Sequence, residues 1–256
     1  MKKTVRLAAF MLAMVLMLTA CGTSGGNGSA SGSTTGASSA DATSANTLRV
    51  VLNSEPSNLD PHNNTRLTAW AVQEEIFDKL VTKDENGNIQ PDLASSWKQI
   101  DDLTWQFKLR DDVTFHDGSK LTSADVVFSF QRACSASGSQ TFFFQFDPDN
   151  IKAVDDYTVN VATKQPFAAV LNYLASARGA ILCKSAVESM GDEAYGRAPV
   201  GSGPYKVDNW TTGNSIVLTR NDNYWGDKPA CSKIEFRFIT EATNRAIELE
   251  TGGADI

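Results

Sequence analysis

The sequence predicts a mixed α/β fold built from short strands and helices. Three stretches carry this prediction. Residues 87–132 have the pattern of a β-hairpin followed by a turn and an amphipathic helix. Residues 48–52 form a short apolar run, which is typical of a strand covered on both faces. Residues 205–220 have the pattern of two strands joined by a turn at Gly213.

The pattern over 87–132 is the most regular in the chain. Residues 104–110 alternate apolar and polar side chains, as in a strand with one buried face, and Asp101-Asp102 should turn it back on a partner strand. Thr122 is expected to cap the following helix, with Asp125 three residues later as the second member of a capping box. The helix should bury a stripe made of Val126, Val127, Phe130 and Ala133.

Further elements are predicted before and after this block. Residues 70–80 have the spacing of a helix, and residues 151–163 that of a hairpin. A second helix should contain Pro166 in its first turn. Residues 234–238 alternate as a half-buried strand, and residues 241–251 should form a helix that ends at a glycine pair.

The order of several short motifs resembles one known family, the extracellular solute-binding lipoproteins (family 5) of peptide and nickel ABC importers. The motifs are Glu55-Pro56 with Leu59-Asp60-Pro61, Pro91-Asp92-Leu93-Ala94, Ser96-Trp97, Thr104-Trp105 with Phe107, Leu109-Arg110, Phe115-His116-Asp117-Gly118, Leu121-Thr122 with Asp125-Val126 and Arg132, Val200-Gly201 with Gly203-Pro204-Tyr205, and Asn223-Tyr224-Trp225-Gly226. The combination is specific, although no single motif would be.

The resemblance implies a domain arrangement. It predicts a lobe of the type II periplasmic-binding-protein kind over residues 48–77 plus 183–256, with an inserted α+β subdomain over residues 78–182. In this family the ligand lies between two lobes, and the sequence accounts for only the first of them. We therefore interpret the sequence as part of a longer chain.

The resemblance also implies ligand-binding residues. The segment after the Glu55–Pro61 stretch lines the ligand cleft of such proteins with main-chain groups, an aromatic residue approaches the ligand from the subdomain, and the glycine-rich segment re-enters the main lobe near the cleft. Carried onto this chain, these are Asn64, Thr65, Arg66, Leu67, Phe143, Ser202, Gly203 and Tyr205. From the residues alone, Phe143 fits a core position better, and the loop after residue 52 could be a structural connection.

The N-terminus has the features of an exported lipoprotein. Lys2, Lys3 and Arg6 precede an uncharged apolar run of 12 residues, which is too short to span a bilayer of ~30 Å as a helix. Residues 1–20 therefore read as a signal peptide that ends before Cys21, where the Leu-Thr-Ala-Cys sequence resembles a bacterial lipobox. The alternative is an ordinary secretory signal.

Residues 21–47 contain almost only small and polar side chains after the cysteine, so they are expected to form a flexible linker between Cys21 and the folded part. The resemblance then implies a protein lipid-anchored on the outer face of the bacterial cell membrane. In a Gram-negative cell this is the periplasmic side.

Charge and cysteine usage exclude several classes. The formal charge is −7, and removal of the leader with its three basic residues leaves −10, so no basic surface for nucleic acid is expected. Cys134, Cys183 and Cys231 match no zinc pattern. One disulfide among them or three free thiols both remain compatible with the sequence.

No catalytic motif or cofactor site is predicted. The paired carboxylates Asp101-Asp102 and Asp155-Asp156 fall at turns, where acidic side chains cap and solvate the chain. The glycine-rich segment at 201–205 lacks the GK[ST] ending of a phosphate loop. The resemblance instead implies a receptor that captures a di- or oligopeptide and delivers it to the transmembrane subunits of an ABC permease. A nickel receptor of the same family and an adhesive lipoprotein are the alternatives.

Overall fold

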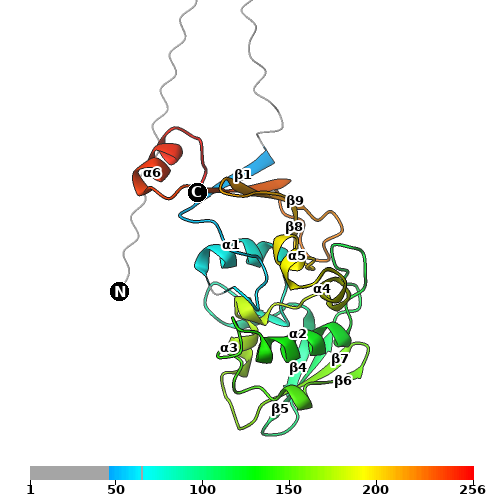
Figure 1. The fold of residues 1–256 in the computed structure, drawn as a ribbon. Coiled ribbons are helices and arrows are strands. Elements are labelled where there is room, and N and C mark those ends of the chain that lie inside the picture. Colours follow the sequence, from blue (N-terminus) through cyan, green and yellow to red (C-terminus); the bar gives the residue numbers. More distant parts are fainter. Residues whose placement is uncertain (1–45, 65) are drawn as a thin grey trace, which may run out of the picture. The chain divides into compact units, whose positions relative to one another are not determined.

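The computed structural model describes residues 46–64 and 66–256, and within them the chain folds around two four-stranded sheets (Figure 1). The predicted leader, the proposed lipidation site Cys21 and most of the predicted linker lie outside the described residues. Among the residues that are described, no helix is long and apolar enough to cross a membrane.

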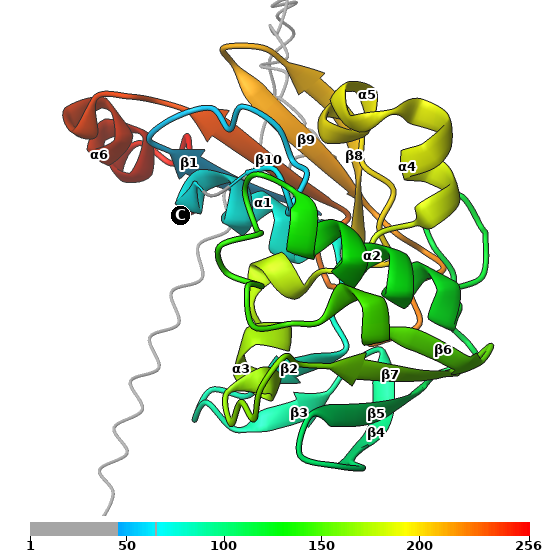
Figure 2. The same ribbon diagram turned by 60° about the horizontal axis from the view of Figure 1, so that its bottom comes forward.

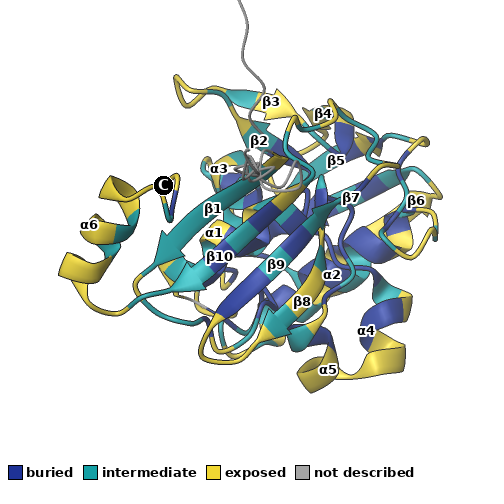
Figure 3. Ribbon diagram, turned by 90° about the horizontal axis from the view of Figure 1, so that it is seen from above, coloured by how far each residue is buried: buried dark blue, intermediate teal, exposed yellow. Residues whose placement is uncertain are grey.

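The first sheet joins the start of the described chain to its end. Its order is β1-β10-β9-β8, with β1 parallel to β10 and the other pairs antiparallel. The strands are β1 (Thr47–Leu52), β8 (Tyr205–Thr211), β9 (Ser215–Arg220) and β10 (Lys233–Phe238). Buried and more exposed residues alternate along β10, as expected for a strand with one covered face (Figure 3).

The second sheet is antiparallel, with the order β4-β5-β7-β6. Its strands are β4 (Ala94–Gln99), β5 (Thr104–Leu109), β6 (Lys152–Asp155) and β7 (Thr158–Ala162). Helix α2 (Ser123–Ser135) lies against β6 and β7 (Figure 2). The predicted hairpin, turn and helix over 87–132 are thus confirmed.

Helix α2 begins with the predicted capping box. The Thr122 side chain accepts from the third helical N–H, and the Asp125 carboxylate accepts from the Thr122 N–H at 3.0 Å. The same carboxylate accepts a hydrogen bond at 3.1 Å from the backbone N–H of Lys184, the first residue of α4 (Lys184–Met190). Asp125 therefore caps one helix and holds the start of another.

The remaining elements lie before, between and after the strands of the two sheets. They are α1 (Leu67–Ile76), the hairpin β2 (Val81–Lys83) and β3 (Ile89–Pro91), the 3₁₀ turns η2 (Pro148–Asn150) and η3 (Ala177–Gly179), α3 (Val170–Leu174), α5 (Asp192–Arg197) and α6 (Ala242–Glu250). Helix α1 packs against β8. Helix α6 contains no buried residue and lies to one side of the first sheet (Figure 3), where its Glu248 pairs with Arg237 of β10 at 2.8 Å.

One hydrophobic core runs through both sheets. Phe107 of β5, Phe130 of α2, Ile76 of α1 and Ile216 of β9 are all fully buried members of it. The division into residues 48–77 plus 183–256 and residues 78–182 remains a prediction.

Three sequence predictions differ from the structure. The helix expected over 70–80 is α1, which begins earlier and ends at Ile76 because Phe77 turns extended. The run 48–52 forms β1, but every residue in it is only half-buried, since β1 is an edge strand of its sheet. The helix expected at Pro166 begins only at Val170.

The sequence left open whether two of the cysteines form a disulfide. In the structure Cys134, Cys183 and Cys231 are free thiols.

A buried carboxylate joins the end of α1 to two distant segments. Asp78 accepts hydrogen bonds from Ser202 Oγ at 2.8 Å, Trp225 Nε1 at 2.9 Å and Tyr224 Oη at 3.2 Å. Asp78 is 6% exposed, so these three donors replace the water that a buried carboxylate loses. The contacts connect the segment between α1 and β2 to the glycine-rich segment and to the Asn-Tyr-Trp motif.

Asp92 lies close to Asp78, and burial disfavours the charged form of both carboxylates. Its carboxylate accepts from the backbone N–H of Lys79 at 3.0 Å. Burial, and then the charge of Asp78, raises the pKa of Asp92 to about 7, and burial also raises the pKa of Asp78. In the folded protein the pair therefore holds a proton at pH values where an unfolded aspartate is ionised.

Asp92→Asn should change how stability depends on pH. Because the pKa of Asp92 is raised on folding, the folded state binds more protons than the unfolded state between about pH 4 and pH 7, and wild-type stability falls as pH rises through this range. The variant has no ionisable group at position 92, so its stability lacks this dependence on pH. The unfolding constant of the wild type should therefore rise relative to that of the variant by about tenfold or more as the pH increases to 8. Urea unfolding at pH 5, 6, 7 and 8 measures it, with Asp111→Asn at an exposed turn as the control. Parallel pH profiles for the wild type and Asp92→Asn would contradict the expectation.

Candidate functional site

The loop between β1 and α1 is held in place from both ends. Glu55 accepts from Trp210 Nε1 at 2.7 Å and from the Gly213 N–H at 2.9 Å, which ties the start of the loop to the β8–β9 hairpin. Asn64 donates to the Asn58 carbonyl at 2.6 Å and accepts from the Arg66 N–H at 2.9 Å. The irregular stretch predicted from its prolines and asparagines is therefore a structured support for the start of α1.

The middle of the loop is fixed by a buried ion pair. Asp60 is 1% exposed and accepts two hydrogen bonds from Arg132 of α2, at 3.0 and 2.6 Å. Burial alone would raise the pKa of Asp60, but the hydrogen bonds and charge of Arg132 outweigh burial and hold this pKa below its ordinary value. Arg132 also donates to Asp192 at 2.8 Å, so one guanidinium joins the loop, α2 and α5.

Most of the predicted site residues fall into two groups. One group lies at the N-terminal end of α1, and the other lies behind this helix. Arg66 and Leu67 lie exposed at the N-terminal end of α1, where Leu67 is 73% exposed. Asn64 is buried beneath them and serves as the tie described above. Thr65 lies outside the described residues. No side chain forms a cap hydrogen bond at the N-cap residue Arg66 in the described chain.

The glycine-rich segment supports α1 from its other end. The Gly203 N–H donates to the Ile76 carbonyl at 2.9 Å, and a Cβ at Gly201 or Gly203 would collide with that carbonyl. Ser202 is fully buried on Asp78, and Tyr205 is 4% exposed with its hydroxyl on the Cys231 carbonyl. Ser202, Gly203 and Tyr205 thus lie behind the helix that bears Arg66.

The aromatic cluster at 142–146 divides between core and surface. Phe143, one of the predicted ligand residues, is fully buried and packs on Phe130 and Phe146. Phe142 instead stacks on Tyr173 at 4.2 Å, and the Arg178 guanidinium lies 5.0 Å from the rings of both Phe142 and Trp70. Sequence reasoning missed this stack because it joins α1 to a residue more than a hundred positions away.

Of the two histidines of the chain, His62 is buried and His116 is partly buried. His62 is fully buried, and neither of its ring nitrogens has a hydrogen-bond partner among the described residues. His116 Nε2 donates to the Gly203 carbonyl at 3.0 Å, and its Nδ1 accepts from the Gly201 N–H. Burial lowers the pKa of each to about 4, so both are neutral at pH 7. Within the described residues no group of three or more His, Cys, Asp or Glu side chains is placed to hold a metal ion.

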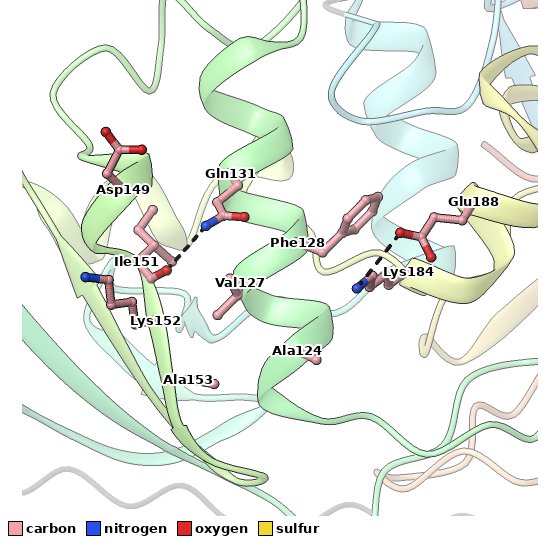
Figure 4. Close-up of a pocket in the computed structure, with 10 residues that line it drawn as sticks. All are labelled: Ala124, Val127, Phe128, Gln131, Asp149, Ile151, Lys152, Ala153, Lys184 and Glu188. Carbon is pink, nitrogen blue, oxygen red and sulfur yellow. Dashed lines mark hydrogen bonds and ion pairs between the residues drawn. The ribbon is translucent and has the colours of Figure 1, made fainter.

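The surface has several hollows. One of about 550 Å³ lies between α2, α4 and the start of β6, with Val127, Phe128 and Ile151 among its lining residues (Figure 4). The Lys184–Glu188 ion pair lies on its α4 side at 3.9 Å. No predicted ligand residue lines it. Two other hollows lie along the loop after β1, and Arg66 lines one of them.

Comparisons with known proteins identify the family to which the fold belongs. A model of bacterial extracellular solute-binding proteins, family 5, matches residues 88–256. The chain belongs to this family. It is 34% identical over 213 residues to the probable D,D-dipeptide-binding periplasmic protein DdpA of Escherichia coli K12, covering 79% of this chain and 41% of DdpA.

A second relative is the glutathione-binding protein GsiB of Escherichia coli O1:K1, at 31% identity over 216 residues, covering 83% of this chain and 42% of GsiB. The chain thus spans about two fifths of the length of these relatives. DdpA and GsiB are both named as binding proteins rather than enzymes.

Solved structures show the same fold. The chain matches AgaA of A. tumefaciens R10 in complex with agropinic acid, with a TM-score of 0.76 at 31% identity over 82% of this chain and 43% of that one. It matches DppA of Helicobacter pylori in complex with the peptide STSA, with a TM-score of 0.75 at 28% identity over 81% and 45%. It also matches NikZ of Campylobacter jejuni in complex with Ni(L-His), with a TM-score of 0.71 at 25% identity over 82% and 42%. The predicted fold class, that of the type II periplasmic binding proteins, is confirmed.

Removing Arg132 should destabilise the protein strongly. Arg132→Met leaves the Asp60 carboxylate buried without its partner, which typically costs about 3–5 kcal/mol in the free energy of unfolding. Urea unfolding followed by tryptophan fluorescence measures the loss. Lys184→Met, which breaks an exposed pair, is the control and should cost less than about 0.5 kcal/mol. Equal midpoints for the two variants would show that the buried pair does not hold the loop.

Proposed function

We propose that this chain supplies the solute-capturing surface of an ABC importer and that the captured solute is a peptide. The observation that carries the proposal is the exposed start of α1, with Arg66 and Leu67, on a loop tied down at Glu55, Asp60 and Asn64. A rigid, exposed backbone segment suits main-chain hydrogen bonding to an extended peptide. Its rigidity also lowers the entropy lost on binding.

The names of the relatives support a peptide or peptide-like ligand. DdpA is named for a D,D-dipeptide, GsiB for glutathione, and the DppA structure holds the peptide STSA. Identities of 28–34% leave room for a different solute on the same fold. The ligand class is therefore inferred from these names together with the exposed start of α1.

Nickel is the alternative ligand within the family, because NikZ holds Ni(L-His). Imidazole nitrogen is a preferred ligand of nickel. His62 of this chain is fully buried, and the partly buried His116 uses its ring nitrogens on the glycine-rich segment. This arrangement favours the peptide over a histidine-bound nickel ion.

The partners and the location are inferred from the family and from the N-terminal sequence. We infer that Cys21 carries a lipid that holds the protein on the outer face of the cell membrane, and that the loaded receptor meets the transmembrane subunits of an ABC permease there. An adhesive lipoprotein is the alternative of a different class. It would attach to surfaces without saturable binding of a small solute.

Calorimetry should detect peptide binding. The protein expressed from its complete gene, without the leader, is titrated with dialanine, trialanine, pentaalanine and nickel chloride. A saturable heat is expected with at least one peptide, with a Kd of about 1 μM or lower. Flat titrations with every peptide and a tight nickel isotherm would replace the peptide by nickel. Flat titrations throughout, with attachment to host surfaces, would favour the adhesive alternative.

Cys21→Ser should release the protein from the membrane. A thioether-linked lipid needs the sulfur of Cys21, and a single apolar run of 12 residues does not anchor a chain by itself. After cell fractionation the wild type is expected in the membrane pellet and the variant in the soluble exported fraction or the medium. Cys231→Ser, which changes a cysteine of the folded part, should stay with the membrane. Equal membrane association of the wild type and Cys21→Ser would refute the lipid anchor.

A further inference from the structure

Three hydrogen bonds join His116 to the glycine-rich segment behind α1. The His116 backbone N–H donates to the Gly201 carbonyl at 2.8 Å, and the Nε2 atom of its ring donates to the Gly203 carbonyl at 3.0 Å. The Nδ1 atom of the ring accepts from the Gly201 N–H at 3.3 Å. Both ring nitrogens are therefore in use, and this pattern requires a neutral ring that carries its proton on Nε2.

The bond to the Gly201 N–H has no substitute. In the described part of the chain, His116 Nδ1 is the only acceptor for this N–H, whereas the Gly203 carbonyl also accepts from Asn221 Nδ2 at 3.2 Å. Gly201 is buried and has no side chain that could hold it by packing. Loss of the acceptor at Nδ1 would therefore leave a buried donor without a partner, which is unfavourable.

Gly201 lies directly against the end of α1. A Cβ atom at Gly201 would collide with the Ile76 carbonyl, and the Gly203 N–H donates to the same carbonyl at 2.9 Å. Ile76 is the last of the 10 residues of α1, so the helix is about 15 Å long. A tilt of about 4° at Ile76 would move the other end, with Arg66 and Leu67, by about 1 Å. The position of Gly201 thus sets where the exposed start of α1 lies.

The surroundings of the His116 ring favour its neutral form. The ring is partly buried, and burial lowers its pKa to about 4. Lys206 of β8 also disfavours the charged ring, whereas the neighbouring Asp117 favours it. The buried Asp78 reaches the glycine-rich segment through Ser202. Protonation of Nδ1 in acid would replace the acceptor for the backbone N–H by a second donor.

We propose that His116 is a positioning residue for solute capture: its neutral ring holds Gly201 against α1, and protonation of Nδ1 releases this hold and weakens capture. This inference rests on the proposed function, since it concerns the same exposed start of α1. His116 acts through Gly201 and Ile76 rather than by contact with the solute. Capture therefore depends on a side chain that lies at the opposite end of the helix.

Two substitutions of His116 separate the hydrogen bond from the ring. His116→Asn keeps an acceptor near the position of Nδ1, whereas His116→Phe keeps a ring without any hydrogen-bonding atom. The protein from the complete gene, without its leader, is titrated with trialanine by calorimetry at pH 7. His116→Phe should bind about fivefold or more weakly than the wild type, and His116→Asn should bind within about twofold of it. Equally weak binding by both variants would overturn the role of the acceptor.

A control variant separates positioning from a general loss of stability. Val159→Ala removes two methyl groups from a fully buried position on β7 and should lower the urea midpoint. It should keep the wild-type affinity for trialanine. A loss of affinity in Val159→Ala as large as that in His116→Phe would show that stability alone governs capture, and would overturn the proposal.

A measurement without peptide separates this role from the proposed function. NMR follows the His116 ring and the backbone amides of Gly201 and Ala69, in the first turn of α1, as the pH of the wild type is lowered from 7 to 3.5. The ring should remain neutral at pH 5.5, where a free histidine is mostly charged. All three signals should then change with one midpoint near pH 4.

His116→Asn assigns this transition. The pKa of His62 is also lowered to about 4, so the shift of Ala69 in the wild type has to disappear in His116→Asn to be attributed to His116. A titrating ring with an unchanged Ala69 signal, or a transition that persists in His116→Asn, overturns the positioning role. A shared midpoint that is lost in His116→Asn supports it even when no peptide produces heat. Flat peptide titrations would then reject only the proposed peptide.

Discussion

The buried carboxylate of Asp78 is the contact on which the arrangement around α1 depends. It lies directly after the helix and accepts from Ser202, Tyr224 and Trp225, which come from segments more than a hundred residues away. A buried carboxylate without these donors would be strongly destabilising. The three donors therefore have to be present together, and this requirement fixes the glycine-rich segment against the C-terminal end of α1.

The N-terminal end of the same helix is fixed by different means and is left open to solvent. Asp60 and Arg132 hold the preceding loop through a buried ion pair, and Asn64 joins that loop to Arg66. The glycine-rich segment thus holds the C-terminal end of the helix, and the preceding loop holds its N-terminal end. The first residues, Arg66 and Leu67, remain exposed. This is the arrangement expected of a recognition surface, because binding energy is not lost in ordering the receptor.

Membership of the family and the individual ligand have different support. The fold is shared with proteins that are named for a D,D-dipeptide or glutathione, or whose structures hold agropinic acid or Ni(L-His). A fold that serves such different solutes does not define one of them. The chemistry at the surface has to do so. Here the surface in question is the exposed start of α1, with Arg66 and Leu67.

Local patterns in the sequence determined the secondary structure. Alternation predicted β5, the Thr122 and Asp125 capping box predicted the start of α2, and short motifs identified the family, because each signal lies within a few residues. Only the tertiary structure decided which predicted residues reach the surface. It buried Phe143 and Ser202, exposed Leu67, and brought Arg197 to Arg66, since burial and the meeting of distant side chains follow from packing between segments far apart in the chain.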